Sequence, residues 1–498
     1  MIRLNQLYKD GAVLQANKPL VIEGYAKGLE QLRACLSGKT LTVRCDKDGL
    51  FLLRFPALPV SPSETLSIEG ETSQLNISVR LGHVFLFAGQ SNMEFKMKQD
   101  THFEEERAAF TESSVCYYNV PQLEYEDGEE TLPSDLEEGS WKKLDCENLG
   151  ELSAVAYYAV KEYQSHFPKT PVGIVSCCKG GTIACCWMSE EYVRQSPGTM
   201  SVIVKPYQEQ ITAKSEEATE QERLAYVEAS IKYYALREKW TKEHPEMSLG
   251  EIKANIGGTP WPPPASPKSF RRPFGLYRTM FRKIVPYTFQ EVIWYQGEDD
   301  TYYAEVYGEL LPLIVSQWRE DLKDSCLPFT IVQLHFFDDK PEKLWPVLRQ
   351  AQQEVLRKLP GLRLVTTFDN GLPDNIHYPD KSLVGKRIGE ILARKYYSCC
   401  PVAVLEEVDK NRIVFQVEHC LELKLSGEKE ELVLETGGIP YLAEIEGSRL
   451  CLVFEGGRLP ERVSYGWSNA PEAVLFNEVG YPVSPFQFEI KGGDFNVV

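Results

Sequence analysis

The sequence feature that most constrains the fold is the apolar run VFLFAG at residues 84–89, which ends abruptly at the polar residues Gln90, Ser91 and Asn92. A short, continuous apolar run of this kind is typical of a strand buried on both faces of a parallel sheet. Open α/β sheets place their ligands at the carboxyl ends of such strands, where a serine can act as a nucleophile. The same serine can instead be the N-cap of the next helix. Its position alone leaves both interpretations open.

The sequence pattern changes along the chain, whose 498 residues exceed what one hydrophobic core supports. Residues 1–83 alternate short β-rich runs with turn residues and predict an N-terminal β-sandwich domain. Residues 84–400 alternate buried strands with helices and predict an α/β domain in which helices cover both faces of a parallel sheet. Its charge-rich stretch at about 190–256 is interpreted as a helical insertion over the site at Ser91. Residues 401–498 return to short alternating strands and predict a C-terminal β-rich region.

Composition and charge narrow the classes of partner. The formal net charge is −18 and no basic stripe is present, which excludes binding to a nucleic-acid backbone. No stretch approaches the roughly 18 uninterrupted apolar residues of a membrane-spanning helix, so we expect no membrane partner. Residues 1–6 lack the apolar core of a secretory signal, which predicts a cytoplasmic protein unless the terminus has been trimmed. The sequence leaves the oligomeric state open.

The chain has 13 cysteines, several of them in adjacent pairs such as Cys177 and Cys178. Neighbouring cysteines rarely bridge each other, and no pair of C-x2-C motifs recurs at zinc spacing. The histidines also show no metal-ligand spacing. We therefore interpret the cysteines as small buried side chains in a reducing compartment and expect no metal site and no cofactor.

Four short blocks together resemble a known family. They are GQSNM at residues 89–93, GGT at 180–182, WYQGE at 294–298 and DNIH at 374–377. In this order they resemble the SGNH-hydrolase superfamily and, more narrowly, the sialate O-acetylesterase family, and the similarity extends over nearly the whole chain. The resemblance implies an SGNH-hydrolase-like α/β fold. It also implies that the closing segment at 465–486 packs against the catalytic domain.

The resemblance implies a catalytic triad. Ser91 is the expected nucleophile and His377 the general base that takes its proton. Asp374, three residues before His377, is expected to hold the imidazole in the correct tautomer. Asp369 also ends a strand-like run and is a rival for that third position.

An acyl-transfer site further needs hydrogen-bond donors for the oxyanion. We expect these to be the backbone N–H groups of Ser91, Gly180 and Gly181, together with the side-chain amide of Gln296. Gln296 is chosen because the family carries glutamine where other SGNH enzymes supply asparagine. Supporting roles are expected for Gln90, Asn92 and Glu298. An ionised carboxylate such as Glu298 accepts hydrogen bonds and cannot donate them.

Some residues depart from the family pattern or allow two interpretations. Asp299 and Asp300 follow the WYQGE block and add negative charge near the expected mouth of the site, which disfavours an acidic sugar. Trp187, Trp294 and Tyr295 could line a sugar pocket, although aromatic residues at strand ends are more often core.

The sequence thus predicts a serine esterase that removes O-acetyl groups from a small sugar substrate, with O-acetylated sialic acid as the first choice. Other acetylated saccharides, such as xylan-type fragments, remain as alternative substrates. Two other functions stay open: a non-catalytic carbohydrate-binding protein on the same fold, and a metallohydrolase that uses the Asp and His residues.

Overall fold

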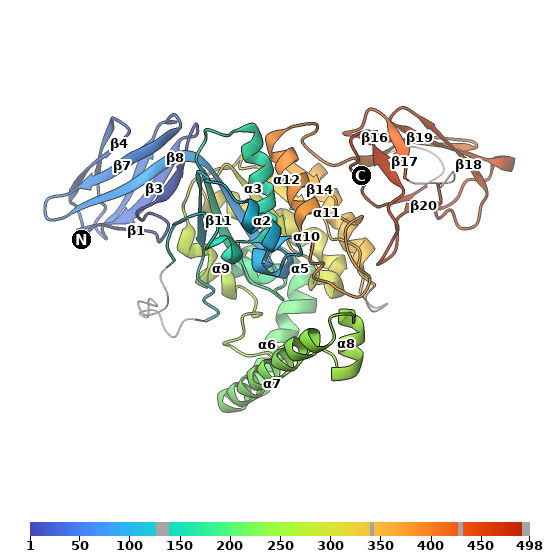
Figure 1. The fold of residues 1–498 in the computed structure, drawn as a ribbon, viewed down its shortest axis with the longest axis horizontal. Helices are drawn as coiled ribbons and strands as arrows, with labels where there is room; N and C mark the ends of the chain where they lie inside the picture. Colours follow the sequence, from blue (N-terminus) through green and yellow to red (C-terminus); the bar gives the residue numbers. More distant parts are fainter. Residues whose placement is uncertain (126–138, 339–342, 427–431, 491–498) are drawn as a thin grey trace.

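The computed structural model describes residues 1–125, 139–338, 343–426 and 432–490. A mostly parallel sheet lies at its centre, with β-rich regions at both ends of the molecule (Figure 1). The predicted α/β class is confirmed. No helix within the described ranges is both long enough and apolar enough to cross a membrane.

The strand order of the central sheet brings the sequence blocks together. In spatial order the strands are β10 (Lys142–Lys143), β9 (Val115–Asn119), β11 (Val172–Cys178), β8 (Gln74–Gly89), β12 (Glu291–Tyr295), β13 (Phe329–Val332) and β14 (Leu362–Val365). All neighbouring pairs from β9 to β14 are parallel. The strands β9 and β11, which follow β8 in sequence, lie on one side of it, and β12 lies on the other. Ligands bind at such reversals of strand order.

Part of the N-terminal region is continuous with this sheet. Their bounds are β1 (Arg3–Leu4), β2 (Ala12–Gln15), β3 (Leu20–Tyr25), β4 (Gln31–Leu36), β5 (Lys39–Arg44), β6 (Leu50–Phe55) and β7 (Ser61–Glu69). The strands β1, β3 and β6 form their own sheet, whereas β2 and β7 pair with the first half of β8.

The expected boundary after residue 83 falls inside β8, and one hydrophobic cluster includes residues from both sides of it. The sequence pattern changes there because the strand becomes covered on both faces. Alternating burial in its first half gives way to the fully buried run at 84–89.

Helices pair with one another around the central sheet. The principal ones are α3 (Ala154–His166), α10 (Ala304–Asp321), α11 (Trp345–Lys358) and α12 (Ser382–Ala393); shorter ones are α1 (Ser91–Glu94), α2 (Phe103–Ala109) and α9 (Gly275–Thr279). Helix α12 packs closely on α3. The close approach is seen at Gly389 of α12, where an added Cβ would lie 2.4 Å from the carbonyl oxygen of Ala159 on α3. Helix α10 packs on α11.

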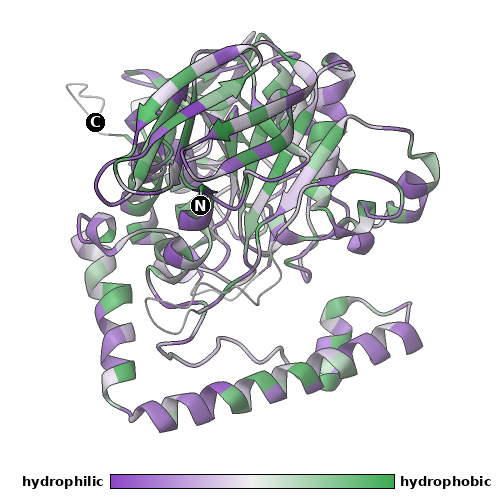
Figure 2. Cartoon of the chain, turned by 90° about the vertical axis from the view of Figure 1, so that its left-hand side faces the viewer, coloured by the Kyte–Doolittle hydropathy of each residue, from purple (hydrophilic) through white to green (hydrophobic). Residues whose placement is uncertain are grey.

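The insertion is helical, as the sequence predicts. It contains α4 (Glu190–Val193), α5 (Pro197–Thr199), α6 (Lys205–Thr212), α7 (Glu216–Glu243) and α8 (Leu249–Ile256). Ser215 caps α7 and Ser248 caps α8 with a capping box. Helix α7 stands apart from the body of the molecule (Figure 2), and only Thr219 and Tyr233 of its side chains are buried.

The C-terminal region has a core of its own. Its strands are β15 (Val402–Asp409), β16 (Arg412–Glu418), β17 (Leu423–Leu425), β18 (Tyr441–Glu446), β19 (Arg449–Phe454), β20 (Arg462–Tyr465), β21 (Leu475–Asn477) and β22 (Phe486–Glu489). The second hydrophobic cluster of the molecule consists of residues from these strands and from the segments beside them, together with Phe368 of the loop after β14. Gln333 donates a hydrogen bond to the Ser484 hydroxyl, so the closing segment contacts the α/β domain.

Candidate active site

Ser91 lies at the turn between β8 and α1. Gly89 ends the strand with a φ of +140°, and a Cβ there would lie 2.0 Å from the carbonyl oxygen of Tyr295, so only glycine fits. Ser91 then becomes the first residue of α1. Its Oγ lies 2.8 Å from Nε2 of His377, which reaches the site from the loop after β14. This is the distance that proton transfer from a serine to a general base requires.

His377 is held in its neutral form. Burial lowers the pKa of its imidazole from 6.5 to about 3, and the positive charges of Lys381, Lys253 and Arg237 contribute in the same direction. A neutral imidazole is the form that accepts a proton. Lys253 and Arg237 belong to α8 and α7, so the insertion affects the electrostatics of this histidine.

Asp374 contacts the insertion and does not contact His377. Its carboxylate accepts a hydrogen bond from the backbone N–H of Gly250 on α8 at 3.2 Å, and no hydrogen bond joins it to His377 among the described residues. This differs from the expected triad geometry, because α8 engages the carboxylate. The rival Asp369 forms a two-point ion pair with Arg387, at 3.0 and 2.9 Å.

Two of the four expected oxyanion donors are available. The N–H groups of Ser91 and Gly181 donate to no acceptor in the described part of the chain. The N–H of Gly180, in contrast, donates to the Glu94 carboxylate at 2.6 Å and is therefore engaged. Gly180 still lies against the nucleophile, because a Cβ built on it would be 3.2 Å from Cβ of Ser91.

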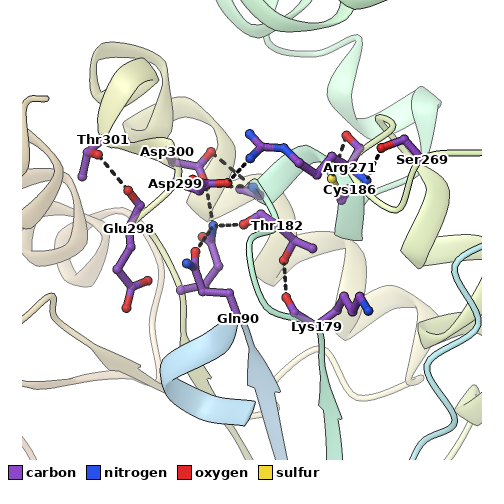
Figure 3. Close-up of polar contacts among 12 residues, drawn as sticks. Gln90, Lys179, Thr182, Cys186, Ser269, Arg271, Glu298, Asp299, Asp300 and Thr301 are labelled. Atoms are coloured by element: carbon purple, nitrogen blue, oxygen red, sulfur yellow. Dashed lines mark hydrogen bonds and ion pairs between the residues drawn. The ribbon is translucent and has the colours of Figure 1, made fainter. Parts of the chain in front are cut away.

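Gln296 is buried and engaged elsewhere, so it differs from the expected oxyanion donor. Its Nε2 donates to the Thr182 carbonyl at 3.0 Å, to Oε1 of Gln90 at 3.2 Å and to the Asp300 carboxylate (Figure 3). Its Oε1 accepts from the Tyr307 hydroxyl. Gln296 thus ties together the ends of β8, β11 and β12, and two N–H bonds shared among three acceptors leave none for an oxyanion.

The two aspartates after the WYQGE block add little free negative charge. Asp299 pairs with Arg271 at 2.5 Å (Figure 3). Asp300 is fully buried, accepts from the N–H of Ala184, and burial raises its pKa to about 7. These two carboxylates therefore give no reason to expect that the site repels acidic sugars.

Asn92 links the nucleophile to the histidine loop through a buried network. Its Nδ2 donates to Glu298 at 2.5 Å and to the carbonyl oxygen of Ile376 at 3.1 Å. Its Oδ1 accepts from Nζ of Lys381 at 2.7 Å. Burial raises the pKa of Glu298 and lowers that of Lys381 to about 7. No sequence pattern identifies Lys381, because a single lysine at the start of a helix carries no sign that it is buried.

The aromatic residues considered for a sugar pocket lie in the core. Trp187 and Trp294 are fully buried, and Tyr295 is 2% exposed. All 13 cysteines are free thiols. Within the described ranges, no three His, Cys, Asp or Glu side chains are grouped to hold a metal ion.

Comparisons with known proteins match most of the chain. A family described as carbohydrate esterase, sialic acid-specific acetylesterase, matches residues 81–231 and 232–398. The sialate O-acetylesterase of Rattus norvegicus is 24% identical over 381 residues, which are 70% of this chain but only 64% of the rat protein. The human sialate O-acetylesterase is 23% identical, over 72% of this chain and 63% of its own length. This chain thus spans less than two thirds of these relatives.

A solved structure resembles the whole chain. It is a novel carbohydrate acetylesterase from Xanthomonas citri, which superposes with a TM-score of 0.69 at 25% identity. The match covers 98% of this chain and 100% of that one. The likeness therefore includes both β-rich ends as well as the central sheet.

Proposed function

Because the chain belongs to the carbohydrate esterase family of sialic acid-specific acetylesterases, we propose that it is a carboxylic ester hydrolase that removes O-acetyl groups from a sugar. We propose O-acetylated sialic acid as the first substrate to test, since the rat and human relatives are named for it. The Xanthomonas relative is named only as a carbohydrate acetylesterase, which supports other acetylated saccharides as the second candidate.

The proposed reaction is acyl transfer through Ser91. His377 accepts the hydroxyl proton while Oγ bonds to the acetyl carbonyl carbon, and the N–H groups of Ser91 and Gly181 donate to the oxygen that becomes negative. The bond from the carbonyl carbon to the sugar oxygen then breaks, and His377 gives its proton to that oxygen. A water molecule, deprotonated by His377, then attacks the acetyl-enzyme; the bond to Oγ breaks, acetate is released, and His377 returns its proton to Oγ of Ser91.

The observation that carries this proposal is the 2.8 Å separation between Oγ of Ser91 and Nε2 of a neutral His377. It supports a Ser–His pair as the reacting unit. The predicted part of Asp374 as a third member is a separate question, which the variants described in the Discussion address.

The test measures released acetate from O-acetylated sialic acid and from acetylated xylo-oligosaccharides. We expect Ser91→Ala to lose at least about a thousandfold in kcat. Ser165→Ala, at an exposed serine of α3, is the matched control and should keep wild-type activity. A labelled fluorophosphonate should modify the wild type and the control and leave Ser91→Ala unmodified.

Other outcomes would select the alternatives. A folded protein that binds the sugars but releases no acetate and takes no label would be a carbohydrate-binding protein. Activity that survives in Ser91→Ala and disappears with a chelator would indicate a metallohydrolase. Either result would end the proposal for Ser91.

A further inference from the structure

We propose that Trp261 is the sugar-binding wall of the active site, on which the pyranose ring of the acetylated substrate stacks. This inference rests on the proposed function. Of the eight tryptophans, all within the described ranges, Trp261 is the most exposed, with 39% of its surface accessible, whereas Trp240 and Trp467 are half-buried and the others are buried. It lies in segment 257–264 after α8, which joins the insertion to the rest of the chain.

The indole ring lies directly beside the oxyanion loop. A Cβ built on Gly181 would lie 2.1 Å from Cη2 of Trp261, and Gly181 has a φ of +69°. Both facts require glycine at this position. Gly181 is next to Gly180, which itself lies against Ser91. An acetyl group bound at Ser91 with its oxygen toward the Gly181 N–H would therefore have its sugar beside the indole.

The indole ring is also held in place. The Arg271 guanidinium lies 4.8 Å from its ring centre, and Arg271 is itself fixed by the Asp299 carboxylate (Figure 3). The Phe270 ring also lies near it, with its centroid 6.5 Å from that of Trp261. A preorganised aromatic ring loses little conformational entropy when a ligand stacks on it.

Stacking against a sugar explains why an indole is left in water here. One face of a pyranose presents mainly C–H groups, and an aromatic ring covers such a face well while its edge stays solvated. Ligand sites commonly combine aromatic walls with a few convergent polar groups. The aromatic residues that end the central strands cannot serve, because they are buried in the core.

The experiment compares two esters that release the same product. Released acetate gives kcat and KM on the acetylated sugar, identified as above, and on ethyl acetate, which has no ring to stack. We expect Trp261→Ala to lower kcat/KM about tenfold or more on the sugar, mainly through KM, and less than about twofold on ethyl acetate. Trp261→Phe should recover most of the loss. Tyr396→Ala removes another exposed aromatic ring, just beyond the end of α12, and should change the kinetics on neither ester.

Two results would overturn the inference. One is a Trp261→Ala variant whose kcat/KM is unchanged on both esters. The other is an equal loss on both esters in a variant that melts like the wild type, because Trp261 would then support the Gly181 loop without contacting the sugar. The proposed function is tested separately, since only Ser91→Ala removes turnover of both esters. Titration of the sugar into Ser91→Ala and Ser91→Ala/Trp261→Ala measures binding without turnover, and the double variant should bind about tenfold more weakly.

Discussion

The protonation state of His377 determines the pH range in which the site is active. Its imidazole must be neutral to accept the serine proton, and the site lowers its pKa from 6.5 to about 3. Protonation therefore occurs at lower pH than for an ordinary histidine. We expect kcat/KM on ethyl acetate to stay constant from pH 7 down to about pH 5. A pH–rate profile checks this, and a half-maximal rate near pH 6.5 would contradict it.

The titration of the buried Lys381 ammonium should make the stability of the protein depend on pH. Burial lowers its pKa from 10.5 to about 7, so between these pH values the unfolded chain binds more protons than the folded one. The free energy of unfolding should consequently rise with pH in this window, by at most about 1.4 kcal/mol per pH unit from this group. Lys381→Met should remove that rise. Urea unfolding at pH 7.5 and 9.5 measures it, and equal slopes in both proteins would contradict the expectation.

The same variant also tests the link to catalysis. Without Nζ of Lys381, the buried Oδ1 of Asn92 has no donor, which costs about 1–3 kcal/mol and loosens Asn92 between the nucleophile and Ile376. We expect kcat to fall about tenfold, and the acid limb to move toward higher pH because a cation near His377 is gone. Lys395→Met, at an ion-paired lysine beyond α12, is the control.

Individual residues were recognisable from the sequence only where a block pattern marked them. The strand-to-polar transition and the DNIH block located Ser91 and His377, which the structure brings into contact. The hydrogen bonds that Gly180 and Gln296 donate could not be predicted from the sequence. Glu94 becomes the acceptor for Gly180, and Thr182 and Asp300 become acceptors for Gln296, only through the tertiary fold. Lys381 was missed for the same reason.

At the scale of elements, the contact between α8 and the histidine loop is the least expected. The Asp374 carboxylate accepts the Gly250 N–H, so its main effect should be to hold the loop. The asparagine oxygen can accept the same bond. We therefore expect Asp374→Asn to lose less than about fivefold in kcat and Asp374→Ala about tenfold. Steady-state kinetics on both esters measures this.

A different result would restore the triad. Loss of a carboxylate that orients a catalytic histidine costs about 10⁴-fold in kcat even when asparagine replaces it. A loss of that size in Asp374→Asn, with an unchanged melting temperature, would mean that the carboxylate bonds to the imidazole during turnover. Asp48→Asn, at an exposed turn of the N-terminal region, controls for the change in charge.

The elements themselves were largely predictable from periodicity. The alternation of buried strands with helices and the helical insertion occur where the pattern indicates them. The expected boundary after residue 83 falls inside β8, because burial on a second face changes the sequence pattern without interrupting the strand. The three polar blocks after β8, β11 and β12 meet because these strands are neighbours, which strand order alone decides.

At the scale of the whole molecule, the C-terminal region is joined to the α/β domain by a buried cation. Arg349 on α11 is fully buried and donates to the carbonyl oxygens of Leu334 and His335 in its own domain. It also donates to those of Ser468 and Asn469 in the C-terminal region, both at 2.8 Å. Burying a charged group costs free energy unless its donors are hydrogen-bonded, so the loss of any of these acceptors should destabilise the fold.

This arrangement predicts that residues 401–490 cannot be removed. In a chain ending at residue 400, Arg349 would lose two of its acceptors. Phe368 would also be exposed, because the other residues of the second hydrophobic cluster would be missing. We expect that chain to be insoluble. In the full chain, Arg349→Met should lower the stability by about 3 kcal/mol, because two buried carbonyl oxygens and two partly buried ones lose their donor. Thermal melting measures this, with Arg357→Met on the exposed face of α11 as the control. A soluble, active truncated chain would instead mean that the α/β domain folds alone.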